Sequence, residues 1–427
     1  MLQIQTLRDE KDRVIRGLKK KGLAEAVRQV DDVIRLDEER KDLQYRLNKL
    51  QEDANRQSAE IGALMKSGNK EAAESLKSGV ASIKEQIKNL ESSLQESEAK
   101  LFEALVVLPN VPHESVPEGK SAEDNEVAGT GSLPAVDMPS WALPHWDLIS
   151  RFDIIDFENG NKVSGAGFPF YKGKGARLQR ALINFFLDEA GKAGYSEMQP
   201  PILINKDSGY GTGQLPDKDG QMYFVQEDGL YLIPTAEVPI TNYLRDVILR
   251  EDQLPQKFAG YTPCFRREAG SWGAHVRGLN RLHQFDKVEI VQVVHPDHSY
   301  EVLEEMRRHV QGLLEKLELP FRVLKLCGGD MSMTSALTYD MEVYSGAQKR
   351  WLEVSSVSNF ETYQSNRLKL RSRSEESKKN YLLHTLNGSA LALPRIVAAL
   401  LENNQTEKDG IKIPAVLHPY TGFDRIS

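Results

Sequence analysis

The sequence predicts an α+β fold in which a long antiparallel helical hairpin precedes a larger domain of alternating helices and strands. Two apolar seams with three- and four-residue spacing run through residues 36–65 and 73–108, and a Ser-Gly-Asn turn at residues 67–69 separates them. From Trp141 onward, short strand patterns alternate with amphipathic helix patterns. We therefore expect a helical arm at residues 1–110, a linker at residues 111–140 and an α+β domain at residues 141–427.

The predicted arm has two interpretations. Periodicity alone favours an oligomerisation coiled coil, which is the more frequent use of such seams. In a hairpin, however, the two seams, which end at Met65 and begin at Ala73, bury each other. Basic side chains gather toward the turn and favour a nucleic-acid phosphate backbone as the partner. These are Lys66, Lys70, Lys77, Lys84 and Lys88, offset only by Glu71, Glu74 and Glu85.

Two strands are expected after the polar stretch at residues 118–131, which we interpret as a linker or mobile loop. The first, residues 195–205, contains Pro200 and Pro201, which belong at a sheet edge or an interface. The second, residues 231–240, runs into polar Thr235 and Glu237. A preceding amphipathic helix is predicted at residues 177–193, so the fold expected here is helix, then strand, then strand.

A strand pair around a Gly-rich, basic loop is the most informative stretch of the chain. Strand patterns at residues 261–267 and 283–291 flank this loop, and the hairpin as a whole carries Arg266, Glu268 and Glu289. The ordinary alternative is a solvated, salt-bridged hairpin. Because polar groups at this density cannot be buried without partners, we expect them to line a cleft.

Two further segments carry groups suited to a nucleotide. A hairpin over residues 339–344 and 351–357 presents Glu353 beside Ser355 and Ser356, oxygen ligands of the kind Mg²⁺ requires. Residues 387–395 are expected to open a helix with Arg395 in its first turns. A cation there opposes the helix dipole and needs an anionic partner such as a phosphate, although an ordinary surface arginine is the simpler alternative.

Composition excludes several other classes. The chain has 427 residues, 40% hydrophobic content and no run of eighteen apolar residues, so we expect a globular cytoplasmic protein with no membrane association. A net charge of −7 by itself argues against a nucleic-acid partner, but local basic patches can override it. Cys264 and Cys327 lack histidine partners at ligand spacing, so we expect no zinc site and no disulfide framework.

Taken in order, these motifs resemble the three signatures of class II aminoacyl-tRNA synthetases, in the wording of bacterial seryl-tRNA synthetases. The matches are the helix-strand-proline unit, F-R-x-E with R-x-H-Q-F, T-A-E, E-x-S-S and the segment ending at Arg395. The resemblance implies a mixed, mainly antiparallel sheet flanked by helices, and a homodimer with Pro201 at its contact. Val354 replaces the usual isoleucine, and Ala390, Leu391 and Pro394 depart from the glycine-rich third motif.

The resemblance also implies residue roles. Arg266 would hold the α-phosphate of ATP and Arg395 the γ-phosphate, and both are expected to be catalytic; Glu268 would read the adenine amino group on which Phe285 stacks. Glu353 and Ser356 would bind Mg²⁺. The expected ATP site comprises Arg266, Arg267, Glu268, Arg281, Leu282, Phe285, Glu353, Val354, Ser355, Ser356 and Arg395; the expected serine site comprises Thr235, Ala236, Glu237, Glu289 and Ser389.

The implied reaction is activation of L-serine by ATP to seryl-adenylate and transfer to tRNA(Ser), and also to tRNA(Sec). Two alternatives remain. A catalytically silent tRNA-binding paralogue should lose Arg266, Arg395 or Glu353, and all three are present. A ligase that loads a carrier protein should lack the long helical arm, and the arm pattern is intact.

Overall fold

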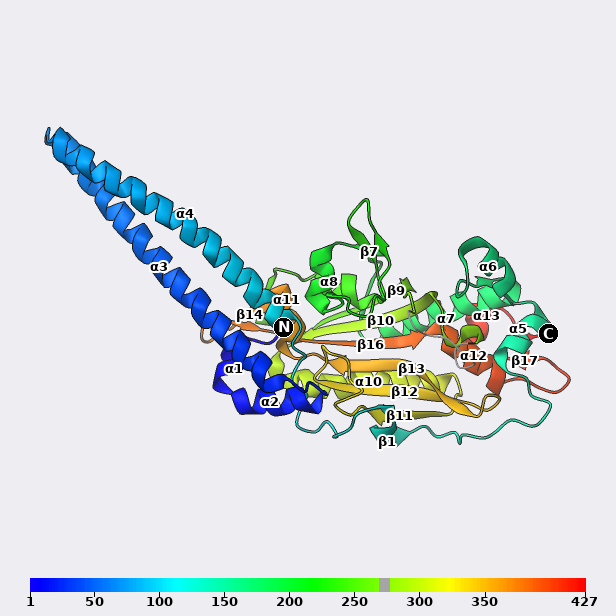
Figure 1. The fold of residues 1–427 in the computed structure, drawn as a ribbon. Helices are drawn as coiled ribbons and strands as arrows, with labels where there is room; N and C mark the ends of the chain where they lie inside the picture. The colour runs from blue at the N-terminus through cyan, green and yellow to red at the C-terminus, as the bar shows by residue number, and fades with distance from the viewer. Residues whose placement is uncertain (269–276) are drawn as a thin grey trace. The chain divides into compact units, whose positions relative to one another are not determined.

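The computed structural model describes residues 1–268 and 277–427 (Figure 1). The chain forms two compact units. One is helical and comprises Leu2–Lys19 and Leu23–Pro109; the other comprises Met1, Lys20–Gly22 and Asn110–Ser427. Across the described ranges, none of the helices combines the length and the apolar character that a membrane span requires.

The helical unit contains the predicted antiparallel hairpin, which is confirmed. Helices α3 and α4 lie side by side along the hairpin (Figure 1). The turn between them uses Gly68 at φ +81°, and the Asn69 side chain caps α4 by accepting a hydrogen bond from the Ala72 amide. With 41 residues, α3 is about 60 Å long. The helices are α1 (Ile4–Asp9), α2 (Lys11–Lys20), α3 (Ala26–Lys66) and α4 (Lys70–Val106).

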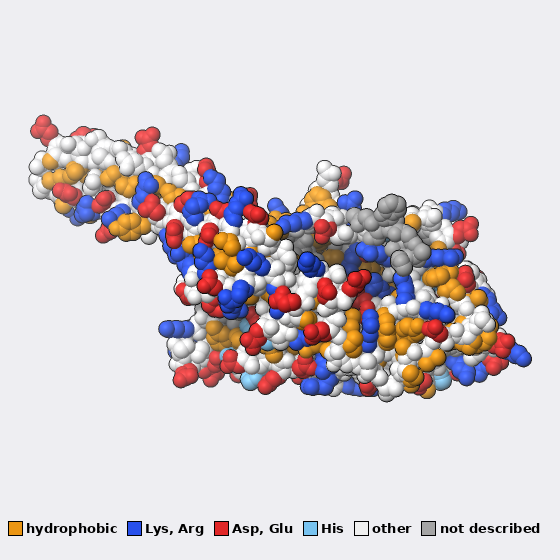
Figure 2. All heavy atoms as spheres, turned by 60° about the horizontal axis from the view of Figure 1, so that its bottom comes forward, with side chains coloured by type: hydrophobic (Ala, Val, Ile, Leu, Met, Phe, Trp, Pro, Cys, Tyr) orange, Lys and Arg blue, Asp and Glu red, His pale blue; other side chains and the backbone are white. Residues whose placement is uncertain are grey.

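The hairpin seam follows the predicted spacing through most of its length. Leu47 and Ala54 of α3 and Val80 and Leu94 of α4 are buried as expected. Met65 was predicted to lie in the seam and is 47% exposed, because the seam passes through the neighbouring Leu64 in the last turn of α3. The remaining surface carries acidic and basic side chains interspersed along the face shown in Figure 2.

One buried carboxylate interrupts the apolar seam. Asp37 has a side chain only 1% exposed, and its oxygens lie 2.9 Å from Arg8, 2.8 Å from Arg40 and 3.0 Å from Lys41. Burial alone would raise the pKa of this carboxyl, but hydrogen bonds from Arg40, Lys41 and Arg8 outweigh burial and lower the pKa to about 2. Asp37 therefore ties α1 to α3 as an anion.

We expect Asp37→Asn to destabilise the helical unit by about 2 kcal/mol near neutral pH, because three cations lose their counter-charge. A carboxyl whose pKa is lowered on folding contributes stability above its unfolded pKa, near 4, and loses it as pH falls toward 2. The difference in unfolding temperature between wild type and variant, measured by calorimetry, should narrow over that window. Asp42→Asn, an exposed aspartate on the same helix, is the matched control. A difference that stays constant from pH 5 to pH 2.5 would contradict the assignment.

The second unit is built on an eight-stranded sheet of order β1-β11-β12-β13-β16-β10-β9-β4. Every neighbouring pair is antiparallel except β4 and β9, which are parallel. The predicted mixed, mainly antiparallel sheet is confirmed. The strands are β1 (Glu126–Thr130), β4 (Ser196–Met198), β9 (Gln256–Phe265), β10 (Gln284–Val294), β11 (Phe321–Lys325), β12 (Leu337–Ser345), β13 (Arg350–Asn359) and β16 (His384–Ala392).

Three helices share a hydrophobic core with this sheet. Leu182 and Phe186 of α7, Met306 of α10 and Ile396 of α12 pack in one cluster with Ile290 of β10. Because apolar side chains alternate along the strands, the side chains between them on β10 face the opposite side of the sheet. The helices of this unit are α5 (His145–Phe152), α6 (Phe157–Ser164), α7 (Gly173–Lys192), α8 (Lys206–Thr212), α9 (Glu237–Asn242), α10 (Ser299–Lys316), α11 (Thr362–Leu368), α12 (Leu393–Asn403) and α13 (His418–Thr421).

Small sheets flank the central one. The strands β5 (Leu203–Ile204), β6 (Phe224–Val225) and β7 (Leu230–Leu232) form one sheet, and β8 (Ile248–Arg250), β14 (Arg371–Arg373) and β15 (Asn380–Leu382) form another. Two pairs complete the set: β2 (Ile155–Asp156) with β3 (Phe170–Tyr171), and β17 (Ile411–Lys412) with β18 (Arg425–Ile426). Within the predicted linker, β1 pairs with β11, so this part of the segment is an edge strand.

Three predicted elements have different bounds in the structure. Residues 195–205 form two short strands in different sheets, β4 and β5, because Pro200 and Pro201 cannot donate ladder hydrogen bonds. The strand expected at residues 231–240 ends at Leu232 and is followed by α9. Residues 387–392, predicted to open a helix, continue β16, and α12 begins only at Leu393. Pairing with both β10 and β13 overrides the local helical pattern there.

Candidate active site

A cleft of about 710 Å³ lies over the central sheet, on the strands β10, β12, β13 and β16. All the predicted site residues line it except two. Arg267 lies outside the lining set, with its amide bonded to the Gln221 carbonyl, and the Ala236 side chain is fully buried before α9. The predicted residues in the lining are Thr235, Glu237, Arg266, Glu268, Arg281, Leu282, Phe285, Glu289, Glu353, Val354, Ser355, Ser356, Ser389 and Arg395.

One wall of the cleft combines an aromatic ring with cations. Phe285 lies at the start of β10, and the guanidinium of Arg266, just after β9, lies 5.2 Å from the centre of its ring. The Arg266 Nε also donates to the Pro234 carbonyl at 3.4 Å. Glu268, at φ +50°, forms an ion pair with Arg281. Most of the Gly-rich loop predicted between these strands, including Gly270, Gly273 and His275, falls in residues 269–276, outside the described ranges.

Arg395 enters the cleft from the first turn of α12. Its Nε donates to the Asn280 carbonyl at 3.2 Å, and its Nη1 donates to the Glu353 carbonyl at 2.7 Å. The same Nη1 lies 3.5 Å from Glu353 Oε2, a carboxylate whose side chain is half exposed. Neutral carbonyls therefore orient the guanidinium, and in the part of the chain that the structure describes its ion-pair partner is this solvated carboxylate. This arrangement leaves Arg395 suited to an additional anion.

A pair of carboxylates lies beside the predicted serines on the neighbouring strands. Asp340 of β12 faces Ser356 of β13 in the sheet register, and its Oδ1 is buried without a hydrogen-bond partner. Burial, followed by the negative charge of Glu353, raises the pKa of Asp340 well above its usual range. Sequence reasoning missed Asp340. Among the described residues no cluster of three or more His, Cys, Asp or Glu side chains could by itself hold a metal ion.

The opposite end of the cleft contains a buried polar network around a lysine. Lys287 Nζ donates to Thr235 Oγ1 at 2.8 Å and lies 2.5 Å from Glu289 Oε2. The Thr235 hydroxyl donates to the same Glu289 oxygen at 3.2 Å. Lys287 was not predicted as a site residue. The signal for it was present, because period-two alternation places it on the same face of β10 as Phe285 and Glu289.

A second carboxylate in this network has an altered acidity. Burial, and then the negative charge of Glu289, raises the pKa of Glu237 to about 7, against opposing contributions from Gln364, Lys287 and Asn387. Gln364 Nε2 donates to Glu237 Oε1 at 2.6 Å, and its own Oε1 accepts from the Thr385 hydroxyl at 2.7 Å. Gln364 was missed because it comes from α11, far away in the sequence.

Ser389 completes this end of the cleft. It lies opposite Glu289 in the register of β16 and β10, and the Ser355 hydroxyl donates to its carbonyl at 2.6 Å. Ser355 is itself buried, so its side chain ties β16 to the neighbouring strand β13. The cleft thus has a cationic, aromatic end and a buried polar end, which suits a molecule with a phosphate part and a small polar part.

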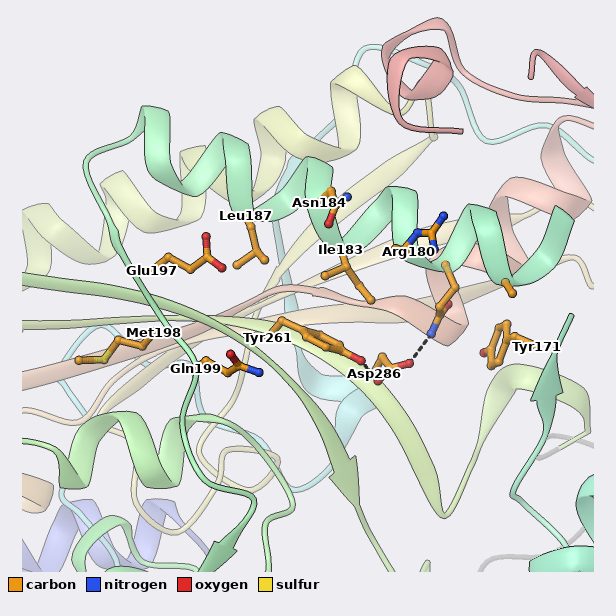
Figure 3. A pocket seen from close by; sticks show the side chains of 12 residues that line it. Tyr171, Arg180, Ile183, Asn184, Leu187, Glu197, Met198, Gln199, Tyr261 and Asp286 are labelled. Carbon is orange, nitrogen blue, oxygen red and sulfur yellow. Dashed lines mark hydrogen bonds between the residues drawn. The ribbon is translucent and has the colours of Figure 1, made fainter. Parts of the chain in front are cut away.

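A second cavity of about 530 Å³ lies between α7 and the strands β4, β9 and β10 (Figure 3). Asp286, between Phe285 and Lys287 in sequence, points into it and accepts hydrogen bonds from Tyr261 and from Gln179, each at 2.8 Å. No predicted site residue lines it. Alternate residues of β10 therefore line the two cavities: Phe285 and Lys287 the larger cleft, and Asp286 the second cavity.

Comparison with known proteins decides the family. Residues 1–112 match the family described as the seryl-tRNA synthetase N-terminal domain, and residues 223–404 match the class II tRNA synthetase core domain for G, H, P, S and T. A protein of Salinibacter ruber named serine–tRNA ligase is 52% identical over 427 residues, which is all of this chain and 99% of the relative. The chain belongs to the seryl-tRNA synthetase family.

Other members of the family match along the full length. A serine–tRNA ligase of Chlorobium phaeovibrioides is 45% identical over 100% of this chain and 99% of its own. The crystal structure of the Pyrococcus horikoshii seryl-tRNA synthetase complexed with ATP has a TM-score of 0.91 and 34% identity, covering 100% of this chain and 99% of that one. As a member of the seryl-tRNA synthetase family, the chain thus has both the helical hairpin and the class II core.

Proposed function

We propose that this chain is a serine–tRNA ligase, which activates L-serine with ATP and transfers the seryl group to tRNA(Ser), and also to tRNA(Sec), in the cytoplasm. The observation that carries the proposal is the cleft itself. It places two arginines, Arg266 and Arg395, at one end and the Thr235–Lys287–Glu289 network at the other. Within residues 1–268 and 277–427, neither arginine has a buried carboxylate as an ion-pair partner. The two relatives described above, which match this chain over its full length, are both named serine–tRNA ligase.

ATP would occupy the cationic end. The Phe285 ring would stack on adenine, with Glu268 accepting from the adenine amino group and Leu282 beside it. Arg266 would hold the α-phosphate and Arg395 the γ-phosphate. Arg281 would assist at the phosphates. Val354 and Ser355 lie in the lining beside Glu353, whereas Arg267 would support the site from outside the lining.

Mg²⁺ fits the donor atoms at this end. Glu353 and Ser356 would hold it, and all of their side-chain donors are hard oxygens, which Mg²⁺ prefers. The unpartnered buried Oδ1 of Asp340 adds a further oxygen beside Ser356. Few protein ligands are expected for this ion, since it keeps waters and binds substrate phosphates. When bound, it would neutralise charge on the phosphates.

Serine would occupy the polar end. Glu237 and Glu289 would pair with its ammonium and hydroxyl, together with Thr235 and Ser389, and Ala236, buried just before α9, would pack behind these residues. Bound alanine would leave buried polar groups of the site unpaired. The cost of these unpaired groups makes the site discriminate against alanine more strongly than the loss of a few packing contacts would. Threonine would be excluded by size.

The chemistry needs little beyond positioning. The serine carboxylate is already charged and attacks the α-phosphorus, and pyrophosphate leaves. Arg266 would stabilise the charge that builds on the α-phosphate, and Arg395 would fix the far end of the triphosphate so that the attack is in line. The carbonyls that orient Arg395 hold its guanidinium in place before the substrate arrives.

The helical arm, residues 1–110, would hold the tRNA, the segment at residues 111–140 would connect it, and residues 141–427 would catalyse both steps. The exposed lysines of the hairpin fit a phosphate backbone better than an apolar partner. Neither alternative agrees with the structure. A silent paralogue should lack one of the two arginines in the cleft, and a carrier-protein ligase should lack the hairpin.

The test of this proposal is ATP–pyrophosphate exchange with each of the twenty amino acids. Serine alone should support exchange, and adding tRNA(Ser) with labelled serine should yield seryl-tRNA. Exchange with another amino acid would replace the serine assignment. No exchange at all would favour the silent paralogue.

The raised pKa of Glu237 predicts a pH-dependent affinity for serine. Below pH 7 the carboxyl is mostly protonated and cannot pair with the substrate ammonium, whereas above pH 7 it is ionised. Serine affinity should therefore rise about tenfold between pH 6 and pH 8, as measured by isothermal titration calorimetry. Glu237→Gln should abolish this dependence, and Glu376→Gln, at an exposed glutamate, should retain it. A flat wild-type profile would refute the assignment.

We also propose that the active form is a homodimer that uses the open edge at β4. This strand ends the eight-stranded sheet, and both Glu197 within it and Pro201 shortly after it are exposed. An exposed strand edge favours pairing with another chain. The wild type should sediment near twice 48.1 kDa. Leu187→Arg, in the adjacent cavity, should give monomer, whereas Val163→Arg on α6 should not. A wild type that is monomeric at every concentration would exclude this contact.

A further inference from the structure

One wall of the catalytic cleft is a loop without regular secondary structure, residues 328–335, which we call the wall loop. Asp330, Ser332, Met333 and Thr334 line the cleft, but the backbone carbonyls of the same loop point to other partners. A loop in this position keeps its shape only if those carbonyls are bonded. Their partners come from segments far away in the sequence.

Lys21 provides the first anchor. Its ammonium donates to the carbonyls of Ser332 at 2.7 Å, Met333 at 3.3 Å and Ser335 at 2.5 Å. Three carbonyls match the three donors of an ammonium group. Burial lowers the pKa of Lys21 to about 7, so these hydrogen bonds replace hydration that the amine has lost.

Asn110 provides the second anchor. It is 3% exposed, its amide donates to the Met333 carbonyl at 2.8 Å, and its Nδ2 donates to the carbonyls of Thr334 at 2.9 Å and Phe360 at 2.8 Å. Its own Oδ1 accepts from the Val111 amide, which fixes the side chain. Phe360 also lines the cleft, so Asn110 joins two parts of the wall.

Two glycines close the start of the loop against the same segments. A Cβ on Gly328 would come 2.4 Å from the Lys20 carbonyl oxygen, and one on Gly329 would come 2.6 Å from the Lys120 Cα. The Gly328 amide donates to the Pro117 carbonyl at 3.0 Å. The residue before Lys21 and the segment after Asn110 therefore contact the loop at backbone distance.

The wall loop is connected to the polar end of the cleft. A Cβ on Gly213 would come 2.4 Å from Thr334 Cγ2, so Thr334 packs directly on the backbone that follows α8. Gln364 donates to the carbonyl of the preceding Thr212 at 3.3 Å and to Glu237 at 2.6 Å. Displacing Thr334 would therefore disturb the residue that holds Glu237, which lies at the end of the cleft we assign to serine.

We propose that Lys21 and Asn110 are positioning residues for serine binding, which act by fixing the wall loop through its carbonyls. The inference rests on the proposed function and extends it to two residues that touch no substrate. Lys21 lies between α2 and α3, and Asn110 follows α4, so both lie in the connections that enter and leave the helical unit. The shape of the amino-acid site thus depends on these two connections.

The experiment compares KM for serine with KM for ATP in serine-dependent ATP–pyrophosphate exchange, with the full chain. Lys21→Met keeps the apolar stem and removes the donors, and Asn110→Asp keeps the shape and removes the Nδ2 donors. Each should raise KM for serine about tenfold and leave KM for ATP within twofold. Lys21→Arg, which keeps donors, should recover most of the serine affinity, and Lys19→Met, at an exposed lysine of α2, should match wild type.

Two results would overturn the inference. Serine KM values within twofold of wild type in both variants would show that the anchors do not position the site. Equal rises in both KM values, with a lowered unfolding temperature, would show a purely structural role. A wild type that fails to exchange with serine would instead refute the proposed function, and the inference with it, so the two failures are distinguishable.

Discussion

Arg266→Ala should lower serine-dependent ATP–pyrophosphate exchange about 1000-fold. Arg266 lies in the cleft beside the Phe285 ring and donates to the Pro234 carbonyl, and no carboxylate among the described residues forms an ion pair with it. We assign that charge to the α-phosphate, where negative charge builds during attack by the serine carboxylate. Removing one preorganised donor at such a position typically costs two to three orders of magnitude in rate. The measurement is the exchange rate at saturating ATP and serine.

Matched variants separate this effect from general loss of charge. Arg250→Ala removes an exposed arginine that pairs with Asp252 away from the cleft, and it should retain wild-type exchange. Arg266→Lys keeps the charge but loses the planar guanidinium, so its exchange rate should lie between those of Arg266→Ala and Arg250→Ala. Unfolding temperatures should be similar for all three proteins. Exchange within tenfold of wild type in Arg266→Ala would remove Arg266 from the reaction.

The catalytic strands were predictable from sequence because their pattern is redundant. Period-two alternation on β10 places Phe285 and Glu289 on one face, and the motifs assign them to the ATP site and the serine site, which share one cleft. The hairpin was predictable for a similar reason, since two long seams and a capped Gly-Asn turn agree with each other. The strands of the cleft and the helical hairpin could be predicted because independent local signals agree in each.

The end of β16 and the partition of residues 195–205 were not predictable, because tertiary pairing decides both. Residues 387–392 carry Leu and Ala, which suit a helix, but β10 pairs along this segment and β13 pairs with its first two residues. The anchors of the site were missed for another reason. Gln364 reaches Glu237 across 127 residues of sequence, and Asn110 reaches Thr334 across 224. No local pattern encodes such contacts.

Replacing Lys66, Lys70, Lys77, Lys84 and Lys88 with serine should lower the rate of tRNA serylation at least 100-fold while leaving ATP–pyrophosphate exchange unchanged. All five are exposed on α3 and α4, within the helical unit, whereas every residue that lines the cleft belongs to the other unit. If these lysines contact phosphates, tRNA binding to the variant releases fewer counterions than binding to the wild type. The tRNA affinity of the variant should therefore depend less steeply on salt concentration. Serylation and tRNA affinity, measured across a salt series, check both expectations.

The control variant carries the same change in net charge at other exposed lysines: Lys369, Lys378, Lys379, Lys408 and Lys412, each replaced with serine. Long-range attraction of an anion depends on total charge, so a loss of serylation in both variants would show that general attraction, and not the arm, is responsible. A loss confined to the arm variant, with a shallower salt slope, would assign the phosphate contacts to the hairpin. Unchanged serylation in the arm variant would return the hairpin to the alternative interpretation, in which its role is oligomerisation.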